Sequence, residues 1–186
     1  MDRPKIVYVM GPSGAGKTRL IDYARRKIDG SLPLVFAHRY ITRPLGTDGE
    51  NYVALTDPEF ALRKAYGLFA CDWQAYQWTY GIGIELVDWL NAGLSVVIDG
   101  SRAHFAAQRL ELAPIVPVFV GARRELLRER LTAREREDAQ AIEERLERAE
   151  RYPPTDLALI NIDNSAAIEA AGESFVRILA DAAPRK

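Results

Sequence analysis

Cysteine, histidine and methionine are scarce in this sequence. Its 186 residues include one cysteine, two histidines and two methionines. A single cysteine excludes an intramolecular disulfide and a metal site of paired thiolates, and we expect a protein of the reducing cytoplasm. An excess of charge is also missing, because 25 Lys and Arg stand against 26 Asp and Glu, for a net charge of -1. This balance argues against a dedicated nucleic-acid binder, which is normally strongly basic.

Long hydrophobic runs are missing as well. The first apolar run, residues 6–10, follows a polar N-terminus and is too short for the core of a signal peptide or for a membrane span. We therefore expect neither export nor a membrane anchor. What the chain does contain is 48% hydrophobic residues, enough for one domain that buries roughly 70% of its unfolded surface. Arginine supplies 20 of the 25 cations, which suits a protein that handles phosphates, although a coding bias explains the same count.

Short apolar runs alternate with segments of helical periodicity along most of the chain. The apolar runs lie at 6–10, 34–37, 94–98, 115–120 and 157–162, and the helical segments at 17–28, 84–92, 102–112, 123–134, 138–151 and 166–182. This alternation predicts an α/β fold in one domain, with a doubly wound parallel sheet flanked by helices.

Two segments interrupt the alternation. Residues 40–80 hold most of the turn-forming residues and at least six aromatic residues, which predicts an inserted subdomain of short strands and one helix. We expect Trp73, Tyr76 and Trp78 in the core of this subdomain. In residues 132–140 the apolar periodicity lapses between two highly charged helices, which predicts a mobile hairpin that bears arginine.

Residues 11–18 match the phosphate-loop pattern G-x-x-x-x-G-K-[ST] in full. They are Gly11, Pro12, Ser13, Gly14, Ala15, Gly16, Lys17 and Thr18. The loop follows a predicted buried strand and begins a predicted helix, so backbone N–H groups can surround phosphates at the positive end of the helix dipole. We expect the loop to bind ATP, with a catalytic Lys17 on the β- and γ-phosphates and the Thr18 hydroxyl on Mg²⁺.

A carboxylate stands at the predicted carboxyl end of a core strand. Asp99 directly follows the apolar run 94–98. In this place it would hold Mg²⁺ through water or face the second substrate, and the alternative is that it caps the next helix.

The phosphate loop, the aromatic insertion and the arginine-bearing hairpin together resemble the guanylate kinase family over nearly the whole chain. The matching residues are 11–18, Tyr40 to Pro44, Asp48 to Tyr52, Tyr80-Gly81, Asp99, Arg134, Arg145-Leu146 and Asn161. The resemblance implies a P-loop kinase with a core, an acceptor-binding subdomain and a lid. Their bounds would be 1–37 with 83–186 for the core, about 38–82 for the subdomain and about 132–140 for the lid.

The same resemblance assigns roles to individual residues. Arg43 and Tyr52 would bind the phosphate of the acceptor. Arg134, Arg145 and Asn161 would contact ATP, and we expect both arginines to be catalytic.

The departures from guanylate kinases lie where that family recognises guanine. The family has a glutamate nine residues before the tyrosine of its Y-G-[ST] motif and a hydroxyl at the end of the motif. Here these positions hold Cys71 and Ile82, which cannot make the hydrogen bonds that read a guanine edge. Ser101 replaces the second carboxylate of the D-x-D motif, and Arg102 follows it. A cation has thus replaced groups that read a base.

An added cation opposite Arg43 suits an acceptor with two phosphates. With residues 38–44, 50–51, 80–85 and 100–104, the chain resembles the ribose 1,5-bisphosphate phosphokinase family of the phosphonate-utilisation pathway. This resemblance implies transfer of the γ-phosphoryl group of ATP to a small phosphorylated sugar, ribose 1,5-bisphosphate. The residues that it assigns to the acceptor are Arg39, Arg43, Tyr52, Tyr80, Asp99, Arg102 and His104.

Some alternatives stay open from the sequence. Arg39 could be an ordinary surface cation, and a structural role competes with substrate binding for His38 and His104. A guanylate or other nucleoside monophosphate kinase is the alternative activity. An inactive guanylate-kinase-like binding module is the other alternative, and the intact Lys17 and Thr18 argue against it. The sequence does not predict the oligomeric state.

Overall fold

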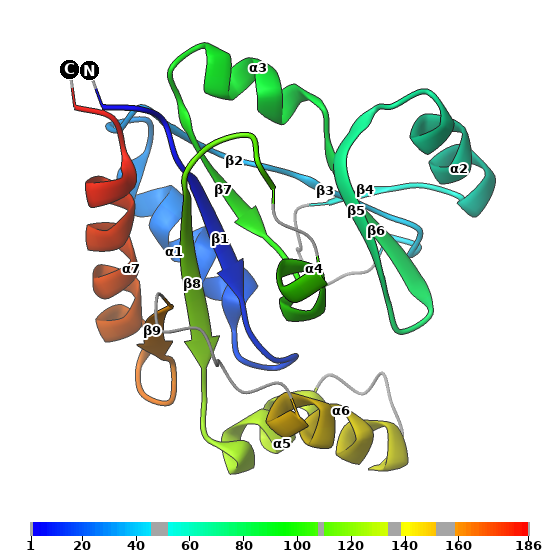
Figure 1. The fold of residues 1–186 in the computed structure, drawn as a ribbon. Coiled ribbons are helices and arrows are strands. Elements are labelled where there is room, and N and C mark those ends of the chain that lie inside the picture. Colours follow the sequence, from blue (N-terminus) through cyan, green and yellow to red (C-terminus); the bar gives the residue numbers. More distant parts are fainter. Residues whose placement is uncertain (1, 46–51, 108–109, 134–138, 152–158, 186) are drawn as a thin grey trace.

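A five-stranded parallel sheet forms the centre of the computed structural model, which describes residues 2–45, 52–107, 110–133, 139–151 and 159–185 (Figure 1). Its strands are β1 (Ile6–Met10), β2 (Leu34–Phe36), β7 (Ser95–Asp99), β8 (Ile115–Gly121) and β9 (Ile160–Asp163). They lie in the order β2-β7-β1-β8-β9, and every pairing between neighbours is parallel. The carboxyl ends of all five strands therefore meet at one edge, where α/β proteins bind their ligands.

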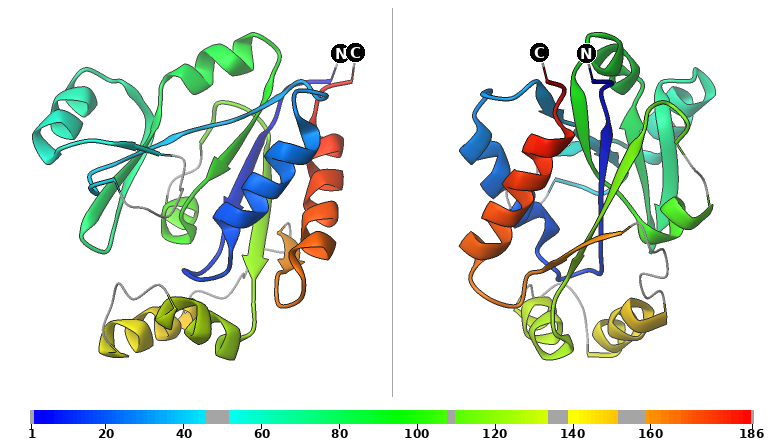
Figure 2. Two further views of the ribbon diagram at one scale, coloured as in Figure 1. Left: turned by 180° about the vertical axis from the view of Figure 1, so that it is seen from behind. Right: turned by 60° about the vertical axis from the view of Figure 1, so that its left-hand side comes forward.

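Both faces of the sheet are buried, which explains why the sequences of β1 and β7 are almost continuously apolar. Side chains of β1 alternate between two hydrophobic clusters, with Val7 and Val9 on one side and Ile6 and Tyr8 on the other. The first cluster packs against α1 (Lys17–Ile28) and α7 (Ile168–Ala182), which lie side by side on one face (Figure 2). The second cluster lies on the opposite face, beneath α3 (Glu85–Asn91).

A second sheet is inserted between β2 and α3. It has four strands in the order β4-β3-β6-β5, and only the β3–β4 pair is parallel. The strands are β3 (Arg39–Ile41), β4 (Tyr52–Ala54), β5 (Phe69–Ala75) and β6 (Trp78–Gly83), and α2 (Asp57–Ala65) lies between β4 and β5. This is the short-stranded insertion with one helix that the sequence predicts.

Three further helices lie near the carboxyl edge of the main sheet. α4 (Arg102–Ala107) follows β7, and α5 (Arg124–Thr132) and α6 (Ala139–Arg151) lie beyond the strand ends (Figure 1). The helix expected at 102–112 is shorter than predicted, because residues 110–112 are not helical; Pro114 soon follows, and proline disfavours helix in the residue before it. None of the described helices has the length and apolar character that crossing a membrane requires.

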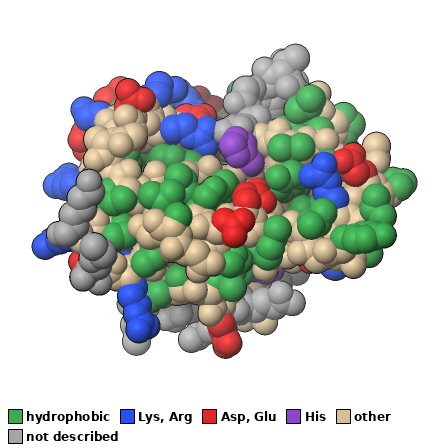
Figure 3. All heavy atoms as spheres, turned by 90° about the horizontal axis from the view of Figure 1, so that it is seen from above, with side chains coloured by type: hydrophobic (Ala, Val, Ile, Leu, Met, Phe, Trp, Pro, Cys, Tyr) green, Lys and Arg blue, Asp and Glu red, His purple; other side chains and the backbone are tan. Residues whose placement is uncertain are grey.

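The face seen over α3 carries hydrophobic, acidic and basic side chains side by side (Figure 3). Leu62 and Ile84 are among the exposed hydrophobic residues of the chain, at 58% and 42% exposure. This surface therefore reflects the near-neutral composition of the chain. The cleft described next differs from it, because positive charge is in excess there.

Candidate active site

A cleft of about 800 Å³ lies at the carboxyl edge of the main sheet, between the phosphate loop, the second sheet and α6. This volume is typical of small-molecule sites. Among the described residues, those of its lining that carry charge are five cations and two carboxylates: Lys17, Arg39, Arg43, Arg102, Arg145, Asp99 and Glu144. The described part of the lining therefore has an excess of three positive charges in a chain whose net charge is -1. Such a concentration of one sign attracts polyanionic ligands.

The phosphate loop connects β1 to α1 and depends on glycine at specific points. Gly11 has φ +155°, and a Cβ atom there would collide with the backbone carbonyl of Val120. Gly16 has φ +86°, and a Cβ atom there would press on the side-chain amide of Asn164. Only glycine fits both requirements, so the loop can approach its neighbours closely and keep its N–H groups accessible.

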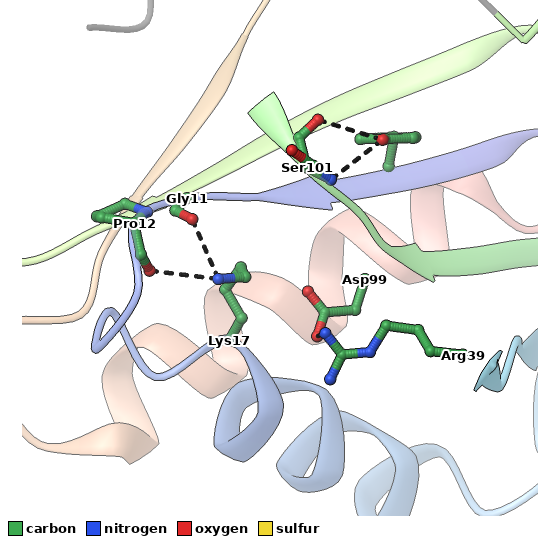
Figure 4. A network of polar contacts seen from close by, with 7 residues as sticks. Gly11, Pro12, Lys17, Arg39, Asp99 and Ser101 are labelled. Atoms are coloured by element: carbon green, nitrogen blue, oxygen red, sulfur yellow. Dashed lines mark hydrogen bonds and ion pairs between the residues drawn. The ribbon is translucent and has the colours of Figure 1, made fainter. Parts of the chain in front are cut away.

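Lys17 is the first residue of α1, directly after Gly16 of this loop. Its Nζ atom donates hydrogen bonds to the carbonyl oxygens of Gly11 at 3.1 Å and Pro12 at 3.2 Å (Figure 4). The ammonium group is thus held at the loop, where phosphate oxygens would be stronger acceptors than these neutral carbonyls. This position agrees with the role expected for Lys17.

Asn164 and Arg130, which the sequence analysis did not single out, contact backbone carbonyls of the phosphate loop. Nδ2 of Asn164 donates to the carbonyl of Ala15 at 2.7 Å, and Nη1 of Arg130 contacts the carbonyls of Gly14 and Ala15 at 3.4 Å. Because C=O and N–H of a trans peptide point to opposite sides, holding the Ala15 carbonyl turns the N–H of Gly16 away from Asn164. Gly16 lines the cleft.

Asn161, expected to contact ATP, does not lie in the cleft. It is exposed on β9, and its Nδ2 atom donates to the carbonyl of Leu159 at 3.4 Å. Side chains of a strand alternate between faces, and it is Ile162 that points into the core. The residue that reaches the phosphate loop is Asn164, 2% exposed and just past the end of the strand. An asparagine directly after the last core strand was the available sequence signal.

Arg145 reaches the phosphate loop from α6. Ile142 and Leu146 are buried on the core side of this helix, which leaves Arg145 facing the cleft. Its Nη1 atom donates to Oγ of Ser13 at 2.9 Å, and its Cζ atom lies 4.1 Å from the centre of the Tyr76 ring. Arg134, the other arginine expected on the ATP side, lies outside the described residues and stays a prediction.

Asp99 and Arg39 form an ion pair inside the cleft. Nη1 of Arg39 lies 3.0 Å from Oδ2 of Asp99, with the two side chains 15% and 10% exposed (Figure 4). Arg39 is therefore not an ordinary surface cation. Asp99 thus pairs with an arginine of β3. In the described part of the chain, we find no hydrogen bond by which Asp99 caps α4, the alternative role considered from the sequence.

The residues around Asp99 fit a magnesium ion. Oδ1 of Asp99 is buried and accepts no hydrogen bond from the residues that the structure describes, and Thr18 lines the same cleft. Carboxylate and hydroxyl oxygens are ligands that Mg²⁺ accepts, together with water and phosphate oxygens. Within the described ranges, no three residues of His, Cys, Asp or Glu gather as a metal site. Most ligands of such an ion would thus come from the nucleotide and water.

Arg43 lines the opposite part of the cleft and rests on Tyr52. Its Nε atom donates to the Tyr52 hydroxyl at 3.4 Å, and its Cζ atom lies 4.7 Å from the centre of that ring. Tyr52 in turn donates to the Pro44 carbonyl at 2.7 Å and is 8% exposed. Tyr52 was expected to bind the acceptor, but it is not among the residues that line the cleft. Its contacts position Arg43 instead.

Tyr80 and Arg102 both line the cleft, as expected. The ring of Tyr80 stacks on Trp73 with a centroid distance of 5.6 Å. Arg102 begins α4, and the segment before it is held by Tyr8, whose hydroxyl accepts a hydrogen bond from the Ser101 N–H at 3.2 Å. Burial raises the pKa of Tyr8, so this hydroxyl stays protonated.

The two histidines do not line the cleft. His104 was expected to bind substrate, but it is 6% exposed and hydrogen-bonds through Nδ1 to the Tyr8 hydroxyl at 2.9 Å. Its ring packs 5.3 Å from that of Trp73, centre to centre. His104 thus connects α4 to β1 and the second sheet, because α4 turns this side chain into the core. His38 is exposed outside the cleft lining.

Cys71 and Ile82, the residues at the guanine-reading positions, face each other across the β5–β6 pair. They are 8% and 1% exposed and belong to the second hydrophobic cluster. Burial raises the pKa of the Cys71 thiol to about 12, so it carries no charge near neutral pH. This part of the second sheet contains no side chain that reads a base edge at these two positions.

Comparison with known proteins places these observations in a family. No family model matches the chain. Curated proteins named ribose 1,5-bisphosphate phosphokinase PhnN are similar to it over nearly the whole length. The protein from Desulfomicrobium baculatum is 44% identical, covering 94% of each chain, and that from Thiobacillus denitrificans is 43% identical, covering 98% of this chain and 96% of its own.

A guanylate kinase structure from Anaplasma phagocytophilum aligns with a TM-score of 0.67 at 16% identity, over 100% of this chain and 90% of that one. This likeness confirms the guanylate-kinase-like α/β fold.

Proposed function

Because the chain belongs to the ribose 1,5-bisphosphate phosphokinase family, we propose that it transfers the γ-phosphoryl group of ATP to ribose 1,5-bisphosphate. The products are 5-phosphoribosyl 1-diphosphate and ADP. The observation that carries this proposal is the cleft itself, which has five cations against two carboxylates and a phosphate loop at one end.

The reaction joins two polyanions and needs little proton transfer. An oxygen of the acceptor's 1-phosphate forms a bond to the γ-phosphorus of ATP, and the bond from that phosphorus to the β,γ-bridging oxygen breaks as ADP leaves. The second pKa of a phosphate ester is about 6, so the attacking oxygen is already anionic at neutral pH and requires no general base. The protein has to bind the two anions, align them and exclude water.

The cations divide between the two substrates. Lys17 and Arg145 belong to the phosphate loop and its neighbouring helix, and we assign them to ATP. Arg39, Arg43 and Arg102 line the part of the cleft formed by the second sheet and α4, and we assign them to the two phosphates of the acceptor. Thr18 and Asp99 would hold Mg²⁺, which neutralises charge on the phosphates of ATP when bound.

Guanylate kinase activity is the alternative, and Cys71 and Ile82 disfavour it. A site that reads a base by hydrogen bonds discriminates against analogues by several powers of ten, and a site without such groups loses that discrimination. The apolar pair in this chain leaves the polar edge of guanine without partners.

The test compares acceptors for one purified protein. We expect Mg-ATP and ribose 1,5-bisphosphate to give a diphosphate product, visible as coupled ³¹P resonances, and GMP to give little or no GDP. Lys17→Ala should abolish transfer at an unchanged melting temperature, whereas Lys27→Ala, at the far end of the same helix, should keep it. Robust turnover of GMP with none of ribose 1,5-bisphosphate would overturn the proposal.

A further inference from the structure

Tyr76 has a backbone conformation that tyrosine rarely adopts. It lies in the two-residue turn of the β5–β6 hairpin, where Ala75 pairs with Trp78, and its φ is +56°. Hairpin turns of this kind require a positive φ, which glycine, asparagine and aspartate supply at the least cost. Among the described residues, the only other non-glycine residue with a positive φ is Asp29, at the end of α1. A bulky residue in such a position points to a use for its side chain.

The side chain of Tyr76 contacts the ATP side of the cleft. The hairpin extends toward α6 in both Figure 1 and Figure 2. Cζ of Arg145 lies 4.1 Å from the centre of the Tyr76 ring, well within the range of a cation–π contact. The same guanidinium donates to Oγ of Ser13 in the phosphate loop. One arginine is therefore held between the phosphate loop and the tip of the hairpin.

Burial distinguishes Tyr76 from its aromatic neighbours. Trp73 is 9% exposed and belongs to the second hydrophobic cluster, whereas Tyr76 is 44% exposed and lines the cleft. The sequence predicted both as core residues, and for Tyr76 this is wrong, because a turn residue cannot point into the sheet that it ends. Its ring thus adds little to the core and contacts Arg145.

We propose that Tyr76 is a positioning residue for Arg145. Its ring holds the guanidinium over the phosphate loop, from the sheet that forms the acceptor side of the cleft. The strands on either side of Tyr76 also carry Trp73 and Tyr80, which line the cleft. An acceptor bound against this sheet would therefore stabilise the hairpin and, through Tyr76, the arginine that binds ATP. The inference rests on the proposed function, in which Arg145 binds ATP.

Because Tyr76 has a positive φ, a substitution by glycine can separate the positioning role of the ring from an effect on folding. Tyr76→Gly removes the ring and supplies the residue that the turn prefers. We expect the Michaelis constant for ATP to rise roughly 3- to 30-fold, the range of one cation–π contact, at a melting temperature equal to or above that of the wild type. Tyr76→Phe keeps the ring and should restore most of the wild-type constant. Asp29→Gly makes the same backbone change far from the cleft and should leave the constant unchanged.

Each outcome decides the inference. An unchanged Michaelis constant in Tyr76→Gly would overturn it, and so would a loss in Tyr76→Phe equal to that in Tyr76→Gly. In an Arg145→Gln background, Tyr76→Gly should have no further effect, and a full additional loss there would also contradict the positioning role. Wild-type enzyme that is inactive with ribose 1,5-bisphosphate would overturn the proposed function, whereas active wild type with an indifferent Tyr76 would overturn only this inference.

Discussion

Nη1 of Arg39 lies 3.0 Å from Oδ2 of Asp99, and the pair connects the second sheet to the carboxyl end of β7 inside the cleft. The two side chains are 15% and 10% exposed, so water screens the pair only weakly. The pair holds one cation of the acceptor side next to the candidate magnesium ligand. It also neutralises part of the charge that the cleft would otherwise carry before substrates bind.

Arg39→Ala should therefore reduce both stability and acceptor use. Removing the guanidinium leaves a poorly exposed carboxylate without its cation, which costs about 2–4 kcal/mol of the free energy of unfolding. Urea unfolding measures this loss, and Arg39→Ala with Asp99→Asn should lose less than Arg39→Ala alone. Arg128→Ala is the control, because its exposed pair with Glu143 should contribute less than about 1 kcal/mol. Equal losses for Arg39→Ala and Arg128→Ala would contradict this prediction.

Arg102→Ala should weaken acceptor use far more than ATP use. Loss of a charged hydrogen-bond donor to phosphate raises the Michaelis constant for ribose 1,5-bisphosphate roughly 10- to 100-fold, while that for ATP changes little. Steady-state kinetics with each substrate varied in turn measures the difference. Arg177→Ala, on the exposed side of α7, is the matched control. Unchanged constants and turnover in Arg102→Ala would remove this residue from the site.

Asn164→Ala and Asn161→Ala should differ sharply although the residues are three apart. Asn164 supplies a buried hydrogen bond to the Ala15 carbonyl, so its loss costs about 1–3 kcal/mol of stability and weakens ATP binding by loosening the loop. Asn161 is exposed and its loss should change neither. Thermal unfolding and ATP titration calorimetry test the pair, and a larger effect at Asn161 would show that the loop is supported differently.

The thiol of Cys71 should be inert in the folded protein. Its pKa is raised to about 12 by burial, so at pH 8 a thiol reagent should label it slowly in the native state and rapidly in urea. The same shift makes stability depend on pH: the unfolded thiol, with a pKa near 9, loses its proton before the folded one does. The contribution of this thiol to the free energy of unfolding is therefore fully present below about pH 9, and it is lost as pH rises toward 12.

Comparison with Cys71→Ala isolates this contribution. The variant should show a smaller loss of unfolding free energy between pH 8 and pH 10 than the wild type, because it lacks the titrating thiol. Rapid labelling of native protein at pH 8, or identical pH profiles for the two proteins, would contradict the buried environment of Cys71.

Parts of the site that depend on contiguous residues were predictable from sequence. The phosphate loop is one such part, because eight consecutive residues specify its turn, its N–H groups and its lysine. Arg43, Arg102 and Arg145 were assigned by resemblance to spaced motifs, and all three line the cleft. Arg102 and Arg145 lie in segments that the helical periodicity also predicts, at 102–112 and 138–151, whereas Arg43 lies in the predicted insertion.

Residues whose role depends on side-chain direction were not predictable. Asn161 lies within the last strand and Asn164 directly after it, and only the folded chain shows that Asn164 is the one that contacts the phosphate loop. His104 and Tyr52 carry polar groups beside the site, and only packing shows that they contact Tyr8 and Arg43 instead of the cleft. Arg134 lies outside the described residues and remains a prediction.

The amino-acid sequence by itself determined the α/β architecture, the phosphate loop and the loss of guanine-reading groups, because each depends on local patterns of apolar residues, glycine and residue type. The tertiary structure alone decided that five cations from separate elements surround one cleft, that Arg39 pairs with Asp99, and that Tyr76 meets Arg145. These relationships join residues far apart in the sequence; Tyr76 and Arg145, for example, are 69 positions apart. Contacts of that kind exist only once the chain has folded.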